Sequence, residues 1–194
     1  MDDDSRRTVR FYVGGEHAIE SEGMWADETP AGTYLVKNIP FFAYQVSYQD
    51  EVAARWCDDG CLWALGVIAN SGNVTLRAAA TASDRICAEA DMARLSGELQ
   101  DLGIGHEEAA HYHLLAINVS EVDDIWGLIR LLGRFERSGQ GIWEESKVMP
   151  WWPHLDRWQP GLMVERVGRW GEDLSVCAIC LPTTSRWSHS SPEE

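Results

Sequence analysis

Short runs of alternating apolar and polar residues fill the first part of the chain. Residues 8–14 alternate in this way up to a Gly-Gly pair, and residues 32–37 have strand-forming side chains up to the interruption at Pro40. A period of two predicts half-buried strands, because successive side chains of a strand point to opposite faces. The intervening residues 16–30 are polar, and we expect them to be irregular.

A β-hairpin is predicted between residues 50 and 69. Two runs with strand character, residues 50–56 and 61–69, are joined by the turn-forming sequence Asp58-Asp59-Gly60. Several short strands separated by turns favour a small antiparallel β-barrel or sheet. We therefore expect residues 1–72 to form an antiparallel β subdomain.

The hydrophobic period changes to that of a helix after residue 80. Residues 74–80 still have strand character, but four apolar residues then recur at helical spacing until Gly103 ends the helix. These four residues are Met92, Leu95, Leu99 and Leu102. A strand over residues 112–119 is predicted after the helix.

A second helix is predicted to follow that strand. Ser120 is its expected N-cap, because acidic residues in the next turn complement the helix dipole. Its apolar stripe consists of Ile125, Leu128, Ile129, Leu132 and Phe135. A last strand at residues 142–146 completes a β-α-β-α-β order, which is most of a ferredoxin-like unit. Residues 73–147 are therefore expected to form a ferredoxin-like subdomain within an α+β fold.

The remaining residues, 148–194, are an extension rich in Trp and Pro that begins with Met149-Pro150-Trp151-Trp152-Pro153. We expect this arm to pack on the first sheet, since an ordered tail has to bury apolar surface. A groove of Trp and Pro side chains for an extended peptide or a flat ligand is the alternative. Residues 162–170 and 174–181 flank a Gly-Glu-Asp turn and predict a second hairpin.

Several motifs of the chain are also found together in a known family. They are Asn38-Ile39-Pro40-Phe41-Phe42-Ala43, Asp50-Glu51-Val52 and Ser71-Gly72-Asn73-Val74-Thr75-Leu76-Arg77, preceded by Trp25-Ala26 and followed by Gly141-Ile142-Trp143-Glu144-Glu145. With these motifs in this order, the chain resembles the bacterial domain-of-unknown-function family 4265 over roughly residues 8–145. The resemblance implies a shared fold, but it does not imply a particular reaction. The chain departs from the family pattern at Gln45 and Gln49, where glycines are usual.

The composition is that of a globular protein, with 45% hydrophobic and 24% charged residues among 194. The formal net charge of −15 repels phosphate backbones and anionic headgroups, so neither a nucleic acid nor a membrane is an expected partner. The same charge favours a basic protein partner, or it serves only to keep the protein soluble. Five cysteines and an acidic start without an apolar signal sequence predict a cytoplasmic protein.

Cysteines and histidines invite two metal-site hypotheses. A zinc site that joins the Cys57/Cys61 pair to the Cys177/Cys180 pair is disfavoured, because an i,i+3 pair on a strand points to opposite faces. Cys57 and Cys61 flank the hairpin turn and are expected to face each other as thiols, close enough to bond under oxidising conditions. The cluster at residues 106–113 lacks the i,i+4 spacing of a zincin, and its histidines are expected to lie in an exposed loop. The alternative is that His111 and His113 share one face of a strand and bind a transition metal together with a third ligand from elsewhere. No metal, cofactor or catalytic group is predicted.

The polar strand face that follows Ser71-Gly72 is the main candidate site. Alternation puts Asn73, Thr75 and Arg77 on one face, where a guanidinium invites a carboxylate or phosphate ligand. Asp50 is expected to orient Arg77. The alternative is that the Arg77–Asp50 pair locks the two subdomains together. The other expected members of a ligand-binding site are Trp25, Tyr44, Trp151 and Trp152.

These observations lead to two functional expectations. The first is a non-enzymatic binding protein whose acidic surface engages a basic protein partner, as an immunity protein or a regulatory adaptor does. The alternative is a small-molecule-binding protein or an enzyme of specialised metabolism, with a pocket between the two subdomains. An RNA-binding role of the ferredoxin-like unit ranks last, because the chain is acidic.

Overall fold

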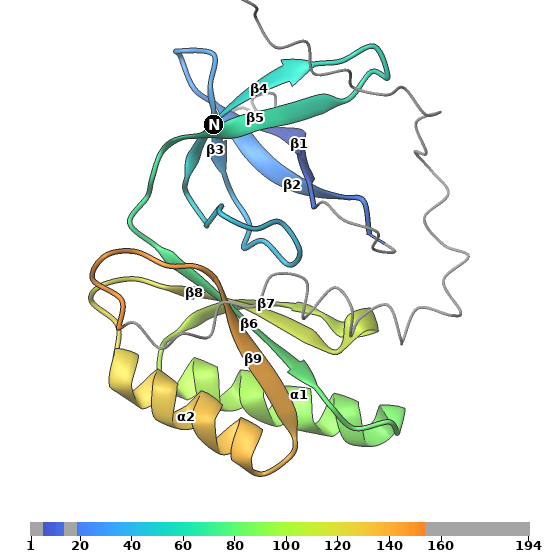
Figure 1. The fold of residues 1–194 in the computed structure, drawn as a ribbon, viewed down its shortest axis with the longest axis vertical. Coiled ribbons are helices and arrows are strands. Elements are labelled where there is room, and N and C mark those ends of the chain that lie inside the picture. The colour runs from blue at the N-terminus through green and yellow to red at the C-terminus, as the bar shows by residue number, and fades with distance from the viewer. Residues whose placement is uncertain (1–5, 14–18, 154–194) are drawn as a thin grey trace, which may run out of the picture.

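The structure is a computed structural model that describes residues 6–13 and 19–153. Three layers follow one another in space: a β-barrel, a four-stranded sheet, and a pair of helices on the far side of that sheet (Figure 1). The fold is therefore α+β, as the sequence predicted. Within the described ranges, neither helix is long and apolar enough to cross a membrane.

Five strands close the barrel. They are β1 (Arg6–Tyr12), β2 (Ser21–Glu28), β3 (Tyr34–Val36), β4 (Glu51–Trp56) and β5 (Leu62–Ala69). Consecutive strands pair antiparallel, as predicted, but the barrel closes through a parallel pairing of β1 with β5. The barrel core consists of Val9, Phe11, Met24, Ala26, Tyr34, Val36, Ala43, Val46, Val52 and Leu62. Of the two predicted alternatives, barrel or sheet, the barrel is confirmed.

The prediction that residues 16–30 are irregular is wrong, because β2 occupies much of this stretch. Along β2, the buried side chains of Glu22, Met24 and Ala26 alternate with exposed ones such as Trp25. The stretch therefore has the period of a strand after all. The carboxylate of Glu22 hid this period in the sequence, because it stands at a buried position where an apolar side chain is the usual choice.

The described part of the second unit contains four strands and two α-helices. They are β6 (Val74–Ala80), α1 (Arg85–Asp101), β7 (Gly105–Ala109), β8 (Leu114–Val119), α2 (Ile125–Arg137) and β9 (Gly141–Lys147), with the short 3-10 helix η2 (Ala110–Tyr112) before β8. The strands lie in the order β7-β8-β6-β9, and all neighbouring strands are antiparallel. Both α-helices cover one face of this sheet, and the barrel lies over the other (Figure 1).

The two helices are capped by aspartates. Asp84 caps α1, and Asp124 caps α2 by accepting a hydrogen bond from the N–H of Gly127 at 2.9 Å. The prediction of Ser120 as the second N-cap is wrong, because α2 begins a turn later. Ser120 instead donates from its N–H and its hydroxyl to the carboxylate of Asp123. Carboxylates therefore fix the conformation of the whole loop between β8 and α2.

The helices and the sheet share one core. It consists of Val74, Leu76, Ala78, Ala80, Ala88, Met92, Leu95, Leu99, Ile104, Leu115, Ile117, Val119, Leu128, Leu131, Leu132, Phe135, Trp143 and Trp152. β6 runs through the middle of the sheet, and every one of its residues is buried. Its apolar side chains at Val74, Leu76 and Ala78 belong to the helix-side core, so Thr75 and Arg77 face the barrel.

β7 is a strand that the sequence analysis did not predict. His106 lies on this strand, half-buried, and its imidazole Nε2 is hydrogen-bonded to the hydroxyl of Ser96 at 2.7 Å. His113 is buried and has a left-handed backbone conformation with a φ of 47°. The prediction that residues 106–113 form an exposed loop is therefore wrong at these two histidines, although His111 is exposed.

The predicted C-terminal arm is described only as far as residue 153. Trp151 donates from its indole N–H to the carbonyl oxygen of Gly72 at 3.1 Å. Trp152 is buried in the helix-side core, and its indole donates to Glu145 at 2.7 Å. The predicted hairpin at residues 162–181 lies outside the described residues, so it remains a prediction.

Candidate functional site

The connection between β3 and β4, residues 37–50, lies between the barrel and the sheet (Figure 1). We call it the joint segment. It contains two of the motifs through which the chain resembles its family, the Asn38–Ala43 stretch and Asp50. About half of its side chains are buried, including Phe42 and Val46. Since a buried backbone has to find hydrogen-bond partners, the contacts of this segment decide how the two units are connected.

Two carboxylates hold the first half of the joint segment by its backbone. Glu22 of β2 accepts hydrogen bonds from the N–H groups of Phe41, Phe42 and Ala43, at 2.8, 2.8 and 2.7 Å. Glu107 of β7 accepts one from the N–H of Ile39 at 3.1 Å. One carboxylate belongs to the barrel and the other to the sheet. The same short stretch is thus bound to both units.

Burial raises the pKa of Glu22 above its ordinary value of 4.5, and the three N–H donors only partly oppose this effect. Loss of water also raises the pKa of Glu107, and the nearby charge of Glu22 adds to this shift. The two carboxyls therefore take up a proton more readily in the folded protein than in the unfolded chain. Each contributes stability below its ordinary pKa that is lost as the pH rises through the raised pKa.

This linkage predicts a pH-dependent difference between the wild-type protein and Glu22→Gln, which carries no titrating group at that position. The free energy of unfolding of the wild type minus that of the variant is expected to fall as the pH rises above about 4.5. Urea titrations between about pH 4 and pH 7 measure this difference. The part of the Glu107 shift that burial causes cancels, whereas the part that the charge of Glu22 causes is lost in the variant and changes the difference in the same direction. A difference that stays constant or grows with pH would contradict the assignment.

Arg77 lies at the centre of the joint with no exposed surface. Its guanidinium pairs with Glu144 of β9 at 3.2 Å and donates to the carbonyl oxygen of Ala43. The guanidinium also lies over the ring of Tyr44, 4.3 Å from its centroid, and the Tyr44 hydroxyl donates to Glu144 at 3.0 Å. One arginine of the sheet therefore binds backbone, ring and carboxylate at the same time.

Asp50 forms the second charged contact of the joint, with Lys147 of β9. It also accepts hydrogen bonds from the N–H of Ser47 at 2.8 Å and from the N–H and hydroxyl of Ser71 at 2.8 and 3.0 Å. The predicted pair of Asp50 with Arg77 is therefore wrong. Arg77 stands opposite Glu144 in the β6–β9 register, so its carboxylate partner comes from the neighbouring strand.

The other polar residues of the β6 face also contact the joint segment. The hydroxyls of Thr75 and Ser47 are hydrogen-bonded at 2.8 Å, and the side-chain amide of Asn73 donates to the carbonyl oxygen of Tyr48 at 3.0 Å. Asn73, Thr75 and the neighbouring arginine thus serve the contact between the two units. Of the two predicted uses of this face, these contacts agree with the lock.

The predicted ligand-binding residues do not all come together. Tyr44 and Asp50 lie in the joint with the β6 residues, whereas Trp25 is 55% exposed on β2. Trp151 contacts Gly72 at the edge of the joint, and Trp152 belongs to the core on the opposite side of the sheet. The eight residues therefore do not line one pocket. Of the proposed pocket walls, Arg77 is buried against Glu144 and the Tyr44 ring, so this part of the contact between the units is filled by side chains.

Four charged members of the joint were not predicted from the sequence: Glu22, Glu107, Glu144 and Lys147. Glu144 and Lys147 are buried on β9, in a strand whose residues 143–147 are all buried. The available signal was a run of polar residues inside a predicted strand, since charges at buried strand positions need partners. The partners themselves lie far away in the sequence, and no local pattern identifies them.

The backbone before Asp50 has the shape that glycines normally supply. Gln45 and Gln49 both have a φ of 63°, in the left-handed region where non-glycine residues are rare. Both are exposed, so their side chains extend into solvent. The positions where this chain departs from its family's glycines therefore keep a left-handed backbone conformation.

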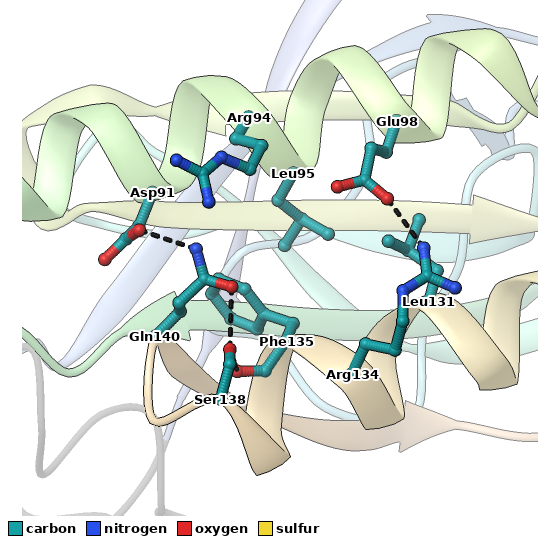
Figure 2. A pocket seen from close by; sticks show the side chains of 9 residues that line it. All are labelled: Asp91, Arg94, Leu95, Glu98, Leu131, Arg134, Phe135, Ser138 and Gln140. Atoms are coloured by element: carbon teal, nitrogen blue, oxygen red, sulfur yellow. Dashed lines mark hydrogen bonds and ion pairs between the residues drawn. The ribbon is translucent and has the colours of Figure 1, made fainter.

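A surface cavity of about 230 Å³ lies between α1 and α2, away from the joint (Figure 2). Leu95, Leu131 and Phe135 contribute its apolar lining. At one end, Gln140 bridges Asp91 and Ser138 with hydrogen bonds of 2.7 Å to each, and other polar groups complete the rim. The rim also contains Arg94, Glu98 and Arg134, of which the last two form an ion pair at 2.7 Å.

The loop that enters α2 presents a different kind of surface. Val122 is 93% exposed and Trp126 is 60% exposed. Exposed Glu121 and Asp124 stand beside them in the sequence, with the half-buried Asp123 between. We call residues 121–126 the acidic loop. Its turns are held by the hydrogen bonds of Asp123 and Asp124, so apolar and acidic side chains are displayed on a fixed backbone.

These features define an α+β protein in which a closed barrel and a helix-covered sheet are joined through buried ionic contacts. The chain belongs to the family described as "Domain of unknown function (DUF4265)", whose model matches residues 22–144. The family resemblance inferred from the motifs is thereby confirmed. The matched range begins at Glu22 and ends at Glu144, so it includes the carboxylates that hold the joint segment.

One solved structure with a similar fold is described as "Novel crystal structure of a hypothetical protein from Neisseria gonorrhoeae". The two sequences are 23% identical, the TM-score is 0.54, and the match covers 73% of this chain and 93% of that one. A likeness at this level of identity shows the fold alone. No curated protein matches the chain.

Proposed function

We propose that this protein is a non-enzymatic binding protein that engages a basic protein partner through the acidic loop. The observation that carries the proposal is the exposure of Val122 and Trp126 beside Glu121 and Asp124. Tryptophan is the side chain most enriched among residues that dominate binding energy. Carboxylates around it favour a partner that presents Lys or Arg next to an apolar side chain.

Two further observations support this role. The loop is preorganised, because Asp123 and Asp124 fix its turns through backbone hydrogen bonds, so little conformational entropy is lost on binding. The net charge of −15 accelerates the approach of a cationic partner over a longer range than direct contacts do. The charged side chains at the centre of the joint, by contrast, are buried in contacts between the two units: Asp50, Arg77 and Glu144 have no exposed surface.

We also propose two finer descriptions of the protein. The order β6-α1-β7-β8-α2-β9, with the strands arranged as β7-β8-β6-β9, supports a ferredoxin-like classification of the second unit. The second description is a cytoplasmic location, which is supported by the odd number of cysteines, five, because an odd number poses no pairing problem in a reducing compartment.

A site-specific photo-crosslinker tests the binding role. Benzoylphenylalanine at position 122 is expected to capture a basic polypeptide in cells of the natural host, because Val122 is the most exposed large apolar side chain among the described residues. The adduct is expected to disappear in the Trp126→Ala background and to decrease when lysates are irradiated at high salt, where charge attraction is screened. The same probe at Ile86, which is 75% exposed on α1, is the matched control.

The captured partner then permits a direct measurement. Trp126→Ala is expected to raise the dissociation constant by about 30-fold or more, which is equivalent to about 2 kcal/mol of binding free energy, as at other tryptophan-centred interfaces. Circular dichroism should show that this exposed substitution leaves the fold intact. Equal adducts at positions 122 and 86, or a captured protein without basic character, would overturn the proposal.

A further inference from the structure

Two cysteines face each other at the end of the β4–β5 hairpin. The last paired residues of the two strands are Trp56 and Leu62, and the N–H of Cys57 donates to the carbonyl oxygen of Cys61 at 3.0 Å. Residues that stand opposite each other in an antiparallel pair have Cα atoms about 4.5–5.5 Å apart, inside the range of about 4.4–6.8 Å that disulfides span. The backbone of the reduced protein therefore already has the spacing that a disulfide requires.

The turn between the cysteines is rigid. Gly60 has a φ of 74° and donates from its N–H to the carbonyl oxygen of Cys57 at 3.0 Å. The carboxylate of Asp59 accepts hydrogen bonds from the Cys61 N–H at 2.9 Å and from the Trp63 indole at 2.8 Å. These contacts keep the backbone of the two cysteines opposed across the turn. Both cysteines are only half-buried, so a small reagent can reach them.

We propose that Cys57 and Cys61 form a reversible thiol–disulfide pair that is oxidised by small-molecule disulfides such as oxidised glutathione. The thiolate of one cysteine attacks the reagent, breaks its S–S bond, and releases one glutathione thiolate. The second cysteine then attacks the protein sulfur of the mixed disulfide and releases the other glutathione. The protein loses two electrons and two protons, and the reagent gains them as two thiols.

Cys87 provides an internal comparison, because it is exposed and is the single cysteine of α1. The Cys87 thiol donates a hydrogen bond to the carboxylate of Asp84, and this contact raises the pKa of the thiol, which lowers the fraction of reactive thiolate at neutral pH. Since α1 contains no second cysteine, we expect Cys87 to stop at a mixed disulfide with the reagent. Its product is therefore different from that of the hairpin pair.

The sequence makes the products separable. Trypsin cleaves after Arg55 and Arg77, so one peptide, residues 56–77, contains both hairpin cysteines. Cys87 falls in the peptide of residues 86–94, and Cys177 and Cys180 fall together in that of residues 170–186. The full-length reduced protein is incubated with oxidised glutathione, alkylated, digested and weighed by mass spectrometry.

We expect peptide 56–77 to lose two hydrogens and to resist alkylation, without a retained glutathione. Cys57→Ser and Cys61→Ser should each retain one glutathione on the remaining cysteine, because no opposed thiol resolves the mixed disulfide. Dithiothreitol should restore two alkylatable thiols in the wild type. Two intact thiols after oxidation, two retained glutathiones, or a disulfide between peptides 56–77 and 170–186 would overturn the proposal.

Discussion

Replacement of Arg77 by methionine is expected to lower the free energy of unfolding by about 3–5 kcal/mol, the loss typical of breaking a buried ion pair. The substitution keeps much of the side-chain volume but removes the cation that Glu144 and the Ala43 carbonyl contact. It also removes the guanidinium from the Tyr44 ring. Urea unfolding at neutral pH, followed by circular dichroism, measures the loss.

An exposed ion pair provides the control. Arg85 and Glu89 are paired at 2.7 Å on the surface of α1, with side chains 80% and 52% exposed. Arg85→Met should change the stability by no more than about 0.5 kcal/mol, because such pairs contribute little in water. The double variant Arg77→Met/Glu144→Gln should be more stable than the sum of the two single losses predicts, since it leaves neither charge of this pair buried without its partner. Similar losses for Arg77 and Arg85 would refute the ionic joint.

Replacement of Gly141 by alanine is expected to destabilise the protein by about 3 kcal/mol, at the upper end of overpacking effects. Gly141 begins β9 directly under α2, and a Cβ there would overlap both the ring of Phe135 and the carbonyl oxygen of Ala79. The carbonyl belongs to β6 and cannot rotate away, so the strand itself has to shift. Thermal unfolding and urea titration both report this loss.

A second glycine distinguishes crowding from a general effect of glycine replacement. Gly97 lies in α1 with open space at its Cβ position, so Gly97→Ala should leave stability unchanged or raise it by up to about 1 kcal/mol. In the Gly141→Ala background, Phe135→Leu should recover part of the loss, because it removes the nearer obstacle. No recovery, together with a similar loss for Gly97→Ala, would contradict a steric overlap at position 141 as the cause.

Local patterns predicted most elements of the fold. The hairpin at residues 50–69 follows from the Asp58-Asp59-Gly60 turn between two strand-forming runs, and its pairing is confirmed. The α1 helix was recognised from four apolar residues at helical spacing, although its overall amphipathic character is weak. Three of the four, Met92, Leu95 and Leu99, are buried in the helix-side core. Patterns of this kind succeed because they depend only on neighbours in the sequence.

The failures have a common cause, which is polar side chains that bind distant partners. β2 was missed because Glu22 occupies an inward position, and β7 was missed because its Gly105-His106-Glu107-Glu108 sequence has little strand character. Both strands supply a carboxylate to the joint segment. A local pattern penalises these residues, whereas the fold requires them.

The candidate site was predicted in its residues but not in its pairing. The sequence placed Thr75 and Arg77 on a shared face with Asp50 nearby, and the structure places all three in the joint. It could not assign Arg77 to Glu144, because that contact depends on the register of β6 with a strand that follows two helices. Register across such a distance is decided by the assembled core and not by any single segment.

The placement of the joint segment affects how sequence similarity within this family should be interpreted. Asp50 and Arg77 belong to the motifs through which this chain resembles its family. Both side chains connect the barrel to the sheet, and neither is accessible to a binding partner. Two members can therefore share all the contacts between their two units and still bind different partners through surface loops that lie outside the family motifs. For such a protein, family membership indicates the fold. The surface loops must be compared before the function of one member is assigned to another.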